Sequence, residues 1–274
     1  MTRLLFIGDI VGKPGREIVR RGLGAIVARH RIDFVIANGE NSAAGFGITP
    51  DIADDLFGCG IHVLTGGNHS WDKKEIVPYL SRQPRLIRPA NYPAGAVGRG
   101  RVIAAGTNGV KVAVINVMGR VFMTAIDDPF KVVLEQIESV RGECALVFVD
   151  FHAEATSEKV AMGWHLDGRV AALVGTHTHV MTADERLLPH GTAYITDVGM
   201  TGPHDSVIGV DRHAILQRFL TGLPQRFETA SDNPRLNAVI VTADETTGRA
   251  TAIDRLSVSA KDVDALVAQP VAVR

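Results

Sequence analysis

Two histidines separated by one residue are the first candidates for chemistry in this sequence. His177 and His179 lie in the segment 174–180, V-G-T-H-T-H-V, directly after the apolar run 170–174. The run is short and aliphatic and ends at Gly175, which is typical of a buried strand that enters a tight loop. Imidazole nitrogens bind divalent transition metals, so the pair is a candidate metal site. Taken alone, the segment fits two loop histidines that bind no metal equally well.

Four further apolar runs end beside side chains that can bind a metal. The runs 3–7, 34–37, 61–65 and 145–149 are followed by Asp9, by Glu40 and Asn41, by Asn68 and His69, and by Asp150 and His152. In an open α/β sheet, ligands bind outside the carboxyl ends of the strands. Core packing does not explain why each of five strands should end this way. We therefore predict that the strands bring these groups to one edge of the fold as a metal site.

The segments between these runs predict an α/β fold. Helical spacing of apolar residues is found in the segments 14–27, 50–57, 71–80 and 129–140. Further strand-like runs are found at 84–87, 101–105, 110–116, 193–196, 238–241 and 250–253, and a turn at 106–109 predicts a hairpin. Alternating strands and helices are typical of a mainly parallel sheet. With no internal repeat or linker, we predict a single domain over 1–274, with two packed sheets flanked by helices.

Composition narrows the classes of function. The 274 residues are 46% hydrophobic, enough for a sizeable core, and the formal net charge of -1 argues against broad nucleic-acid binding. The N-terminus lacks a signal-peptide pattern, and no apolar run approaches the ~20 residues of a membrane span. Cys59 and Cys144 are the only cysteines, which favours a reducing compartment. We predict a cytoplasmic protein with no membrane partner and no dedicated nucleic-acid binding; a homo-oligomer remains open.

Five short motifs connect the candidate residues to a known family. They are 8–12 (G-D-I-V-G), 37–41 (A-N-G-E-N), 66–72 (G-G-N-H-S-W-D), 116–120 (N-V-M-G-R) and 196–203 (T-D-V-G-M-T-G-P). With His152 and the 175–179 segment, they follow the order of the calcineurin-like metallophosphoesterase signature. Over nearly the whole chain they resemble the YmdB-like branch of that superfamily. The resemblance implies an α/β fold that is a four-layer α/β/β/α sandwich of two mixed sheets flanked by helices.

Two positions depart from the wider superfamily in the way that the YmdB-like branch does. Val11 stands where the usual Asp-x-His motif has its histidine, and Glu40 stands where the usual bridging aspartate is found. In the branch that this chain resembles, the asparagine after the glutamate replaces the missing ligand, which here is Asn41. Both departures therefore favour membership of the branch over loss of the metal site.

The resemblance also implies a set of ligands for two metal ions. The first ion would take Asp9, Glu40, Asn41 and His179, and the second would take Glu40, Asn68, His152 and His177. A shared carboxylate can bridge two cations ~3.5–4 Å apart. Nitrogen and oxygen ligands without a thiolate suit iron or manganese better than a cysteine-type zinc site. We expect two divalent or trivalent ions, with iron as the first choice and manganese as the second.

The family's chemistry is the cleavage of phosphodiesters, including 2′,3′-cyclic nucleotides. The resemblance implies that His69 protonates the leaving alkoxide, help worth ~10²–10⁴-fold. The nucleophile would be a hydroxide held by the metals, since coordination brings the pKa of water from 15.7 to about 7. The expected substrate is a small phosphodiester or nucleotide. Two alternatives are a broad phosphomonoesterase or protein phosphatase with the same metals, and a regulatory protein that senses a nucleotide without turnover.

Several residues outside the signature have more modest predicted roles. Asp150 is expected to orient a metal-binding imidazole through its free N–H, and His62 to be packed within a strand. Arg120 is interpreted either as a phosphate contact or as a surface or structural arginine, and His204 is weighed as a minor candidate for lining the pocket. The glycines around Phe46 are expected to shape a loop near the metals.

Overall fold

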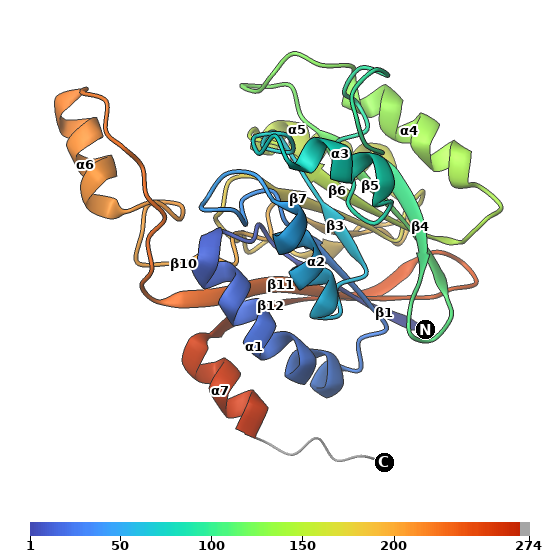
Figure 1. Ribbon diagram of the computed structural model, residues 1–274. Coiled ribbons are helices and arrows are strands. Elements are labelled where there is room, and N and C mark those ends of the chain that lie inside the picture. Colours follow the sequence, from blue (N-terminus) through green and yellow to red (C-terminus); the bar gives the residue numbers. More distant parts are fainter. Residues whose placement is uncertain (269–274) are drawn as a thin grey trace.

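The structure is a computed structural model that describes residues 1–268, and two mixed β-sheets form its centre (Figure 1). The first sheet contains β1 (Thr2–Ile7), β2 (Phe34–Asn38), β3 (Val63–Thr65), β10 (Gly202–Pro203), β11 (Pro234–Ala243) and β12 (Ala250–Ser259). Its order is β10-β11-β1-β2-β3, and β12 also pairs with β11. The strands β1, β2 and β3 run parallel, whereas β11 is antiparallel to each of its neighbours.

The second sheet lies against the first. It contains β4 (Arg101–Ala105), β5 (Lys111–Met118), β6 (Leu146–His152), β7 (Ala172–Thr176), β8 (Arg186–Leu187) and β9 (Ala193–Ile195), in the order β4-β5-β6-β7-β9-β8. Its four central strands are parallel, and β4 and β8 add antiparallel edges. The predicted hairpin is confirmed by the antiparallel pairing of β4 with β5.

Helices cover the outer face of each sheet, so the predicted four-layer α/β/β/α sandwich is confirmed. The first sheet is covered by α1 (Gly12–His30), α2 (Pro50–Gly58), α3 (Ile76–Arg82) and α7 (Ala260–Ala268). The second sheet is covered by α4 (Pro129–Val140) and α5 (Thr156–Leu166). One helix, α6 (Arg212–Thr221), stands apart from both sheets in Figure 1.

Alternating side chains divide the interior into its layers. On β1, Leu4 and Phe6 belong to the apolar cluster between the two sheets, whereas Leu5 and Ile7 belong to the cluster beneath the helices. Successive residues of a strand point to opposite faces, so two fully buried faces require the continuous apolar run seen in the sequence. The rings of Phe6 and Phe148 stack between the sheets, with centroids 5.4 Å apart.

The structure corrects two of the predicted elements. The helix expected over 71–80 begins only at Ile76, because the preceding residues form turns in which Asp72 bonds the His69 ring and Trp71 donates to the carbonyl of Val97. The strand expected at 84–87 is reduced to isolated bridges at Leu86 and Ile87. The prediction of one domain over 1–274 extends into 269–274, which lie outside the described residues.

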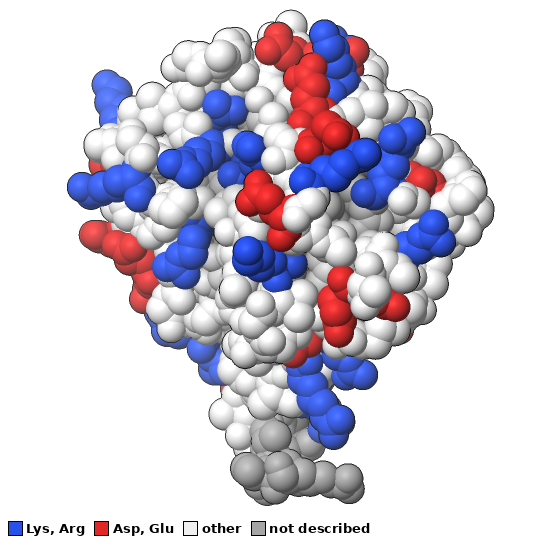
Figure 2. Space-filling view, turned by 90° about the vertical axis from the view of Figure 1, so that its right-hand side faces the viewer, with Lys and Arg blue, Asp and Glu red and all other residues white. Residues whose placement is uncertain are grey.

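The distribution of surface charge and the character of the helices are relevant to nucleic acids and membranes as possible partners. Figure 2 shows basic and acidic side chains intermixed over one face of the molecule, consistent with the formal net charge of -1. Among the described residues, no helix has the length and apolar character needed to cross a membrane.

Candidate metal centre

All eight predicted site residues lie at one edge of the molecule. They follow β1, β2, β3 and β7 or end β6, and are Asp9, Glu40, Asn41, Asn68, His69, His152, His177 and His179. Asp9, Glu40, Asn41 and His152 are buried, and the others are half-buried. The carboxyl ends of the parallel strands of both sheets therefore meet here.

One group of these side chains converges on His152. The His152 Nε2 atom lies 3.0 Å from Glu40 Oε1, 2.9 Å from Asn68 Oδ1 and 3.1 Å from His177 Nδ1. One donor atom each from Glu40, His152 and His177 lies within 4.8 Å of the other two. Two imidazole nitrogens and two oxygens that point at a common volume match the ligand types of a transition metal.

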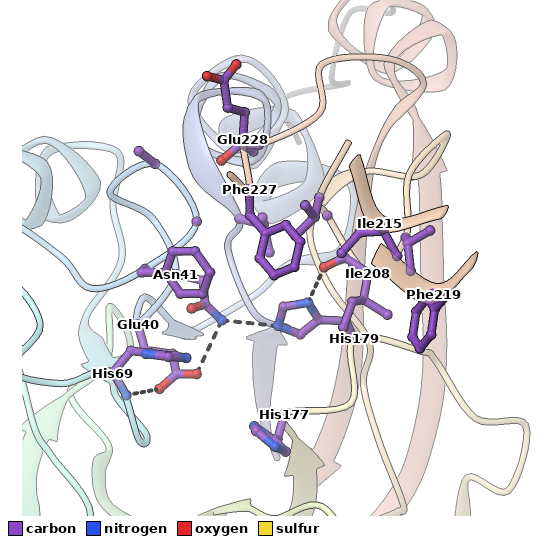
Figure 3. Close-up of a pocket in the computed structure, with 18 residues that line it drawn as sticks. Glu40, Asn41, His69, His177, His179, Ile208, Ile215, Phe219, Phe227 and Glu228 are labelled. Atoms are coloured by element: carbon purple, nitrogen blue, oxygen red, sulfur yellow. Dashed lines mark hydrogen bonds between the residues drawn. The ribbon is translucent and has the colours of Figure 1, made fainter. Parts of the chain in front are cut away.

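A second group lies on the other side of Glu40. The Asn41 Nδ2 atom lies 3.2 Å from Glu40 Oε1 and 3.1 Å from His179 Nε2, as Figure 3 shows. Asp9 Oδ2 accepts a hydrogen bond of 3.2 Å from the backbone N–H of His177. Glu40 therefore contacts members of both groups.

Two buried oxygens in this centre fit a bound cation. Asp9 Oδ1 and Asn41 Oδ1 are buried and have no hydrogen-bond partner among the described residues. An unsatisfied buried acceptor costs ~1–3 kcal/mol, and such groups in native proteins call for an explanation such as an ion. Both oxygens belong to the predicted ligands of the first metal, so the residues present fit that group.

Each of the three candidate metal-site histidines also has a polar contact at its other ring nitrogen. His152 Nδ1 lies 2.9 Å from Thr176 Oγ1, His179 Nδ1 lies 2.8 Å from the carbonyl of Ile208, and His177 Nε2 lies 3.1 Å from a Glu154 carboxylate oxygen. Metal-binding histidines typically hold their other ring nitrogen in this way, which fixes the orientation of the ring.

The electrostatics favour positive charge at the centre. Burial raises the pKa of the Glu40 carboxyl, but the imidazoles of His152 and His69 outweigh burial and lower that pKa to about 2. Burial lowers the pKa of His152, but Glu40 and Asp9 outweigh it and raise that pKa to about 9. Burial and the neighbouring His152 lower the pKa of His177 to about 3. A positive charge beside the buried Glu40 carboxylate is therefore favoured, and a metal ion would supply it in place of a protonated imidazole.

Local backbone structure brings the ligands close together. A Cβ atom at Gly67 would clash with the carboxylate of Glu40 and the imidazole of His152. The backbone at His177 (φ 99°) and His179 (φ 67°) is left-handed, a conformation that costs energy outside glycine. Strain of this kind persists only where the surrounding structure holds it in place.

A buried ion pair holds this strained loop, and the sequence analysis missed it. Lys159 Nζ donates to Asp197 Oδ2 at 2.6 Å and to the carbonyl of Thr176 at 2.8 Å. The same Asp197 oxygen accepts from the backbone N–H of Thr178 at 3.1 Å. One signal was available, because Lys159 shares the buried stripe of α5 with Met162 and Leu166.

The predicted role of Asp150 needs correction. Asp150 does not bond the His152 ring directly; its Oδ1 accepts from Thr176 Oγ1 at 2.7 Å, and Thr176 contacts His152. Thr65 Oγ1 donates to the other carboxylate oxygen at 2.5 Å. Burial, only partly offset by His152 and these hydroxyls, raises the pKa of Asp150 to about 6.

His69 lies at the mouth of the centre. Its ring is partly exposed, and its Nδ1 atom lies 2.7 Å from Asp72 Oδ2. Its backbone N–H donates to Glu40 Oε2 at 3.1 Å, which places the ring beside the ligands. The ring also contacts that of Phe46, on the glycine-flanked loop expected near the metals.

The structure shows the surroundings of three other residues for which the sequence predicted a role. Arg120 forms an exposed ion pair with Asp128, with 3.4 Å between Nη2 and Oδ2, which favours the structural interpretation. His62 was expected within a strand, but it lies just before β3 and is half-buried; its ring stacks on that of Phe34, and its Nδ1 atom accepts from the backbone N–H of Val35. His204 is half-buried and lines a separate hollow beside His179, and it is not among the residues that line the pocket of Figure 3.

Comparison with known proteins identifies the family of this chain. A family model described as "YmdB-like protein" matches residues 5–256. The 2′,3′-cyclic-nucleotide 2′-phosphodiesterase of Bacillus subtilis is 48% identical over 257 residues, covering 94% of this chain and 97% of that protein.

Two solved structures share the fold. A hypothetical protein from Thermus thermophilus has a TM-score of 0.87 and 42% identity, covering 94% of this chain and 99% of that chain. A phosphatase from Mycoplasma pneumoniae has a TM-score of 0.88 and 34% identity, covering 94% of this chain and 93% of that chain. The chain described here belongs to the YmdB-like family.

Proposed function

We propose that this protein is a two-metal phosphodiesterase that hydrolyses 2′,3′-cyclic nucleotides. The observation that carries the proposal is the position of Glu40 between two groups of candidate ligand side chains, one of which has two buried oxygens with no hydrogen-bond partner among residues 1–268. The name of the Bacillus subtilis relative supports the choice of substrate. The proposal treats residues 1–274 as one catalytic domain acting in the cytoplasm on a small molecule.

The proposed ligands form two sets that share Glu40. Asp9, Glu40, Asn41 and His179 would hold one cation, and Glu40, Asn68, His152 and His177 would hold the other. We favour iron and keep manganese as the second choice, because the ligand atoms are nitrogen and oxygen without thiolate. When bound, the cations would supply Lewis acidity to the phosphoryl oxygens and lower the pKa of coordinated water to about 7.

The protein's own contribution to bond cleavage is proton transfer by His69. Hydrolysis adds water across the bond between phosphorus and O2′, which leaves a 3′-phosphate and a free 2′-hydroxyl. The departing O2′ needs a proton, because an alkoxide is a poor leaving group. Asp72 holds His69 Nδ1 at 2.7 Å, so Nε2 is the nitrogen that we assign as the donor.

A substrate panel on reconstituted protein tests this proposal. Protein loaded with iron or with manganese is compared on 2′,3′-cyclic AMP, an aryl phosphodiester and an aryl phosphomonoester. We expect the highest kcat/KM on the cyclic nucleotide. Turnover of the monoester alone would replace the proposal with phosphomonoesterase activity. Tight nucleotide binding with no turnover of any substrate would point to the sensing alternative.

A further inference from the structure

The pocket beside the proposed metal centre has one polar side and one apolar side. Its volume is about 310 Å³, at the lower end of the ~300–1,000 Å³ typical of small-molecule sites. Its polar side is formed by His69 and four of the proposed metal ligands, Glu40, Asn41, His177 and His179. The apolar side includes Phe46, Ile208, Phe219 and Phe227. A phosphate bound at the metals would therefore carry its substituent towards aromatic rings.

Phe46 is held next to the proposed acid although 40% of its surface is exposed. Its ring meets the His69 ring edge-on, with centroids 5.1 Å apart and an interplanar angle of 69°. The loop that carries it has left-handed backbone at Ala44, Gly45 and Gly47. The exposed ring lines the pocket beside His69, where it can contact a bound ligand.

Phe227 also lies on the apolar side of the pocket, in a segment that we call the α6 arm (204–230). The arm joins β10 to β11 and is closed on itself by bridges of Val210 with Val207 and with Thr229. The guanidinium of Arg218 lies 5.1 Å from the centroid of the Phe227 ring. Figure 3 shows that ring pointing into the pocket beside His179.

We propose that this apolar wall is a subsite for the nucleobase of the substrate, with Phe46 and Phe227 as its aromatic contacts. The proposal rests on the proposed function, because it takes the phosphate to lie at the metal ligands. Bases stack on aromatic side chains through their faces, and each stacked base contributes on the order of 10-fold in affinity, about 1.4 kcal/mol.

The composition of this apolar wall predicts that the subsite accepts different nucleobases. Its polar residues are Glu228, which is exposed and whose carboxylate points out of the pocket in Figure 3, and Thr229. Hydrogen bonds to base edges are what distinguish one base from another, and stacking is tolerant of base identity. We therefore expect purine and pyrimidine nucleotides to bind within about 10-fold of one another.

Binding of adenosine 3′-monophosphate and of inorganic phosphate to the metal-loaded protein tests the subsite directly. Calorimetry is carried out on wild type, Phe46→Ala, Phe227→Ala and the control Phe122→Ala, whose ring is 90% exposed and does not line the pocket. We expect the first two substitutions to weaken nucleotide binding on the order of 10-fold and to leave phosphate binding unchanged. Phe46→Trp and Phe227→Tyr should restore nucleotide affinity, and the control should change neither ligand.

Two outcomes would overturn the subsite. One is an equal loss of affinity for nucleotide and phosphate in both alanine variants, which would assign these rings to the metal centre itself. The other is wild-type protein that binds the nucleotide no more tightly than phosphate. Failure of the proposed function is a separate result, because it would appear as absent turnover of 2′,3′-cyclic AMP whatever the binding comparison gives.

Discussion

Glu40 and His69 occupy neighbouring positions with different proposed tasks. Glu40 is buried between two groups of ligand atoms, whereas the His69 ring is partly exposed and bonded to Asp72. A metal ligand and a proton donor respond differently to substitution, so the two roles can be separated by experiment.

Replacing His69 should slow catalysis and leave the metals in place. For His69→Ala and His69→Asn we expect metal content to stay at the wild-type level and kcat on 2′,3′-cyclic AMP to fall ~10²–10⁴-fold. The loss on an aryl phosphodiester should be smaller, because an acidic phenol leaves without a proton donor. Steady-state kinetics with parallel elemental analysis gives the answer. Equal losses on both substrates would instead indicate a role in phosphate binding.

At the residue scale, candidate site residues could be predicted from the sequence where a side chain that can bind a metal follows an apolar run. That pattern located Asp9, Glu40 and His152, and the motifs allowed a division into two ligand groups to be predicted. It did not reveal Thr176 as the link between Asp150 and His152, because a threonine at a strand end has no distinctive spacing. Such links depend on side-chain positions that only the folded structure defines.

At the element scale, α5 stabilises the loop after β7. Lys159 and Asp197 are each 1% exposed in their side chains and are 2.6 Å apart. Their bonds to Thr176 and Thr178 flank the left-handed residue His177. Removing one partner of a buried ion pair leaves the other charge uncompensated.

Lys159→Met should therefore destabilise the fold strongly. We expect the free energy of unfolding to fall by ~3–5 kcal/mol in urea titrations. The matched control is Lys13→Met, which removes the exposed pair of Lys13 with Glu17, 3.5 Å apart, and should cost ~0–1 kcal/mol. The double variant Lys159→Met with Asp197→Leu should recover part of the loss. Equal effects of the two lysine substitutions would show that the buried pair holds nothing in place.

The ends of a helix could be predicted only where a clear local signal in the sequence marks them. The helix 129–140 was predicted with the observed ends, and in the structure it begins at Pro129, directly after the capping residue Asp128. The helix α6 was not predicted, although Ile215, Leu216, Phe219 and Leu220 recur at helical spacing. Only Ile215 is buried among the residues of α6, because the α6 arm stands apart from the sheets.

At the scale of the whole molecule, the proposed cations would join both sheets. Asp9 and Glu40 follow strands of the first sheet, whereas His152 and His177 end or follow strands of the second. A ligand that binds only the folded state adds RT ln(1 + [L]/Kd) to its stability, ~2.7 kcal/mol at a hundredfold excess over Kd.

Chelation should accordingly lower the thermal stability of the entire domain. From a shift of roughly 2–4 °C per kcal/mol we expect Tm to fall by roughly 5–10 °C, and to recover when manganese or iron is restored. Calorimetry of the Glu40→Gln variant provides the control, because that protein should respond much less to the chelator. An unchanged wild-type Tm would mean that the ions do not connect the sheets.

The family resemblance predicted the four layers of the fold. The apolar runs themselves could not show which strands pair parallel and which pair antiparallel. The strand β11 is antiparallel to β1 and β2 is parallel to it, yet both lie buried and read as continuous apolar runs. Strand direction depends on the path of the connecting segments, which hydrophobicity does not encode.

Metal stoichiometry of wild type and Glu40→Gln, measured by elemental analysis after reconstitution with iron or manganese, tests the central claim most directly. A two-ion centre that shares the Glu40 carboxylate predicts about two equivalents in the wild type. It also predicts that Glu40→Gln loses metal from both positions while circular dichroism shows a folded protein. A folded wild type without metal, or a Glu40→Gln variant with full metal content, would contradict the account.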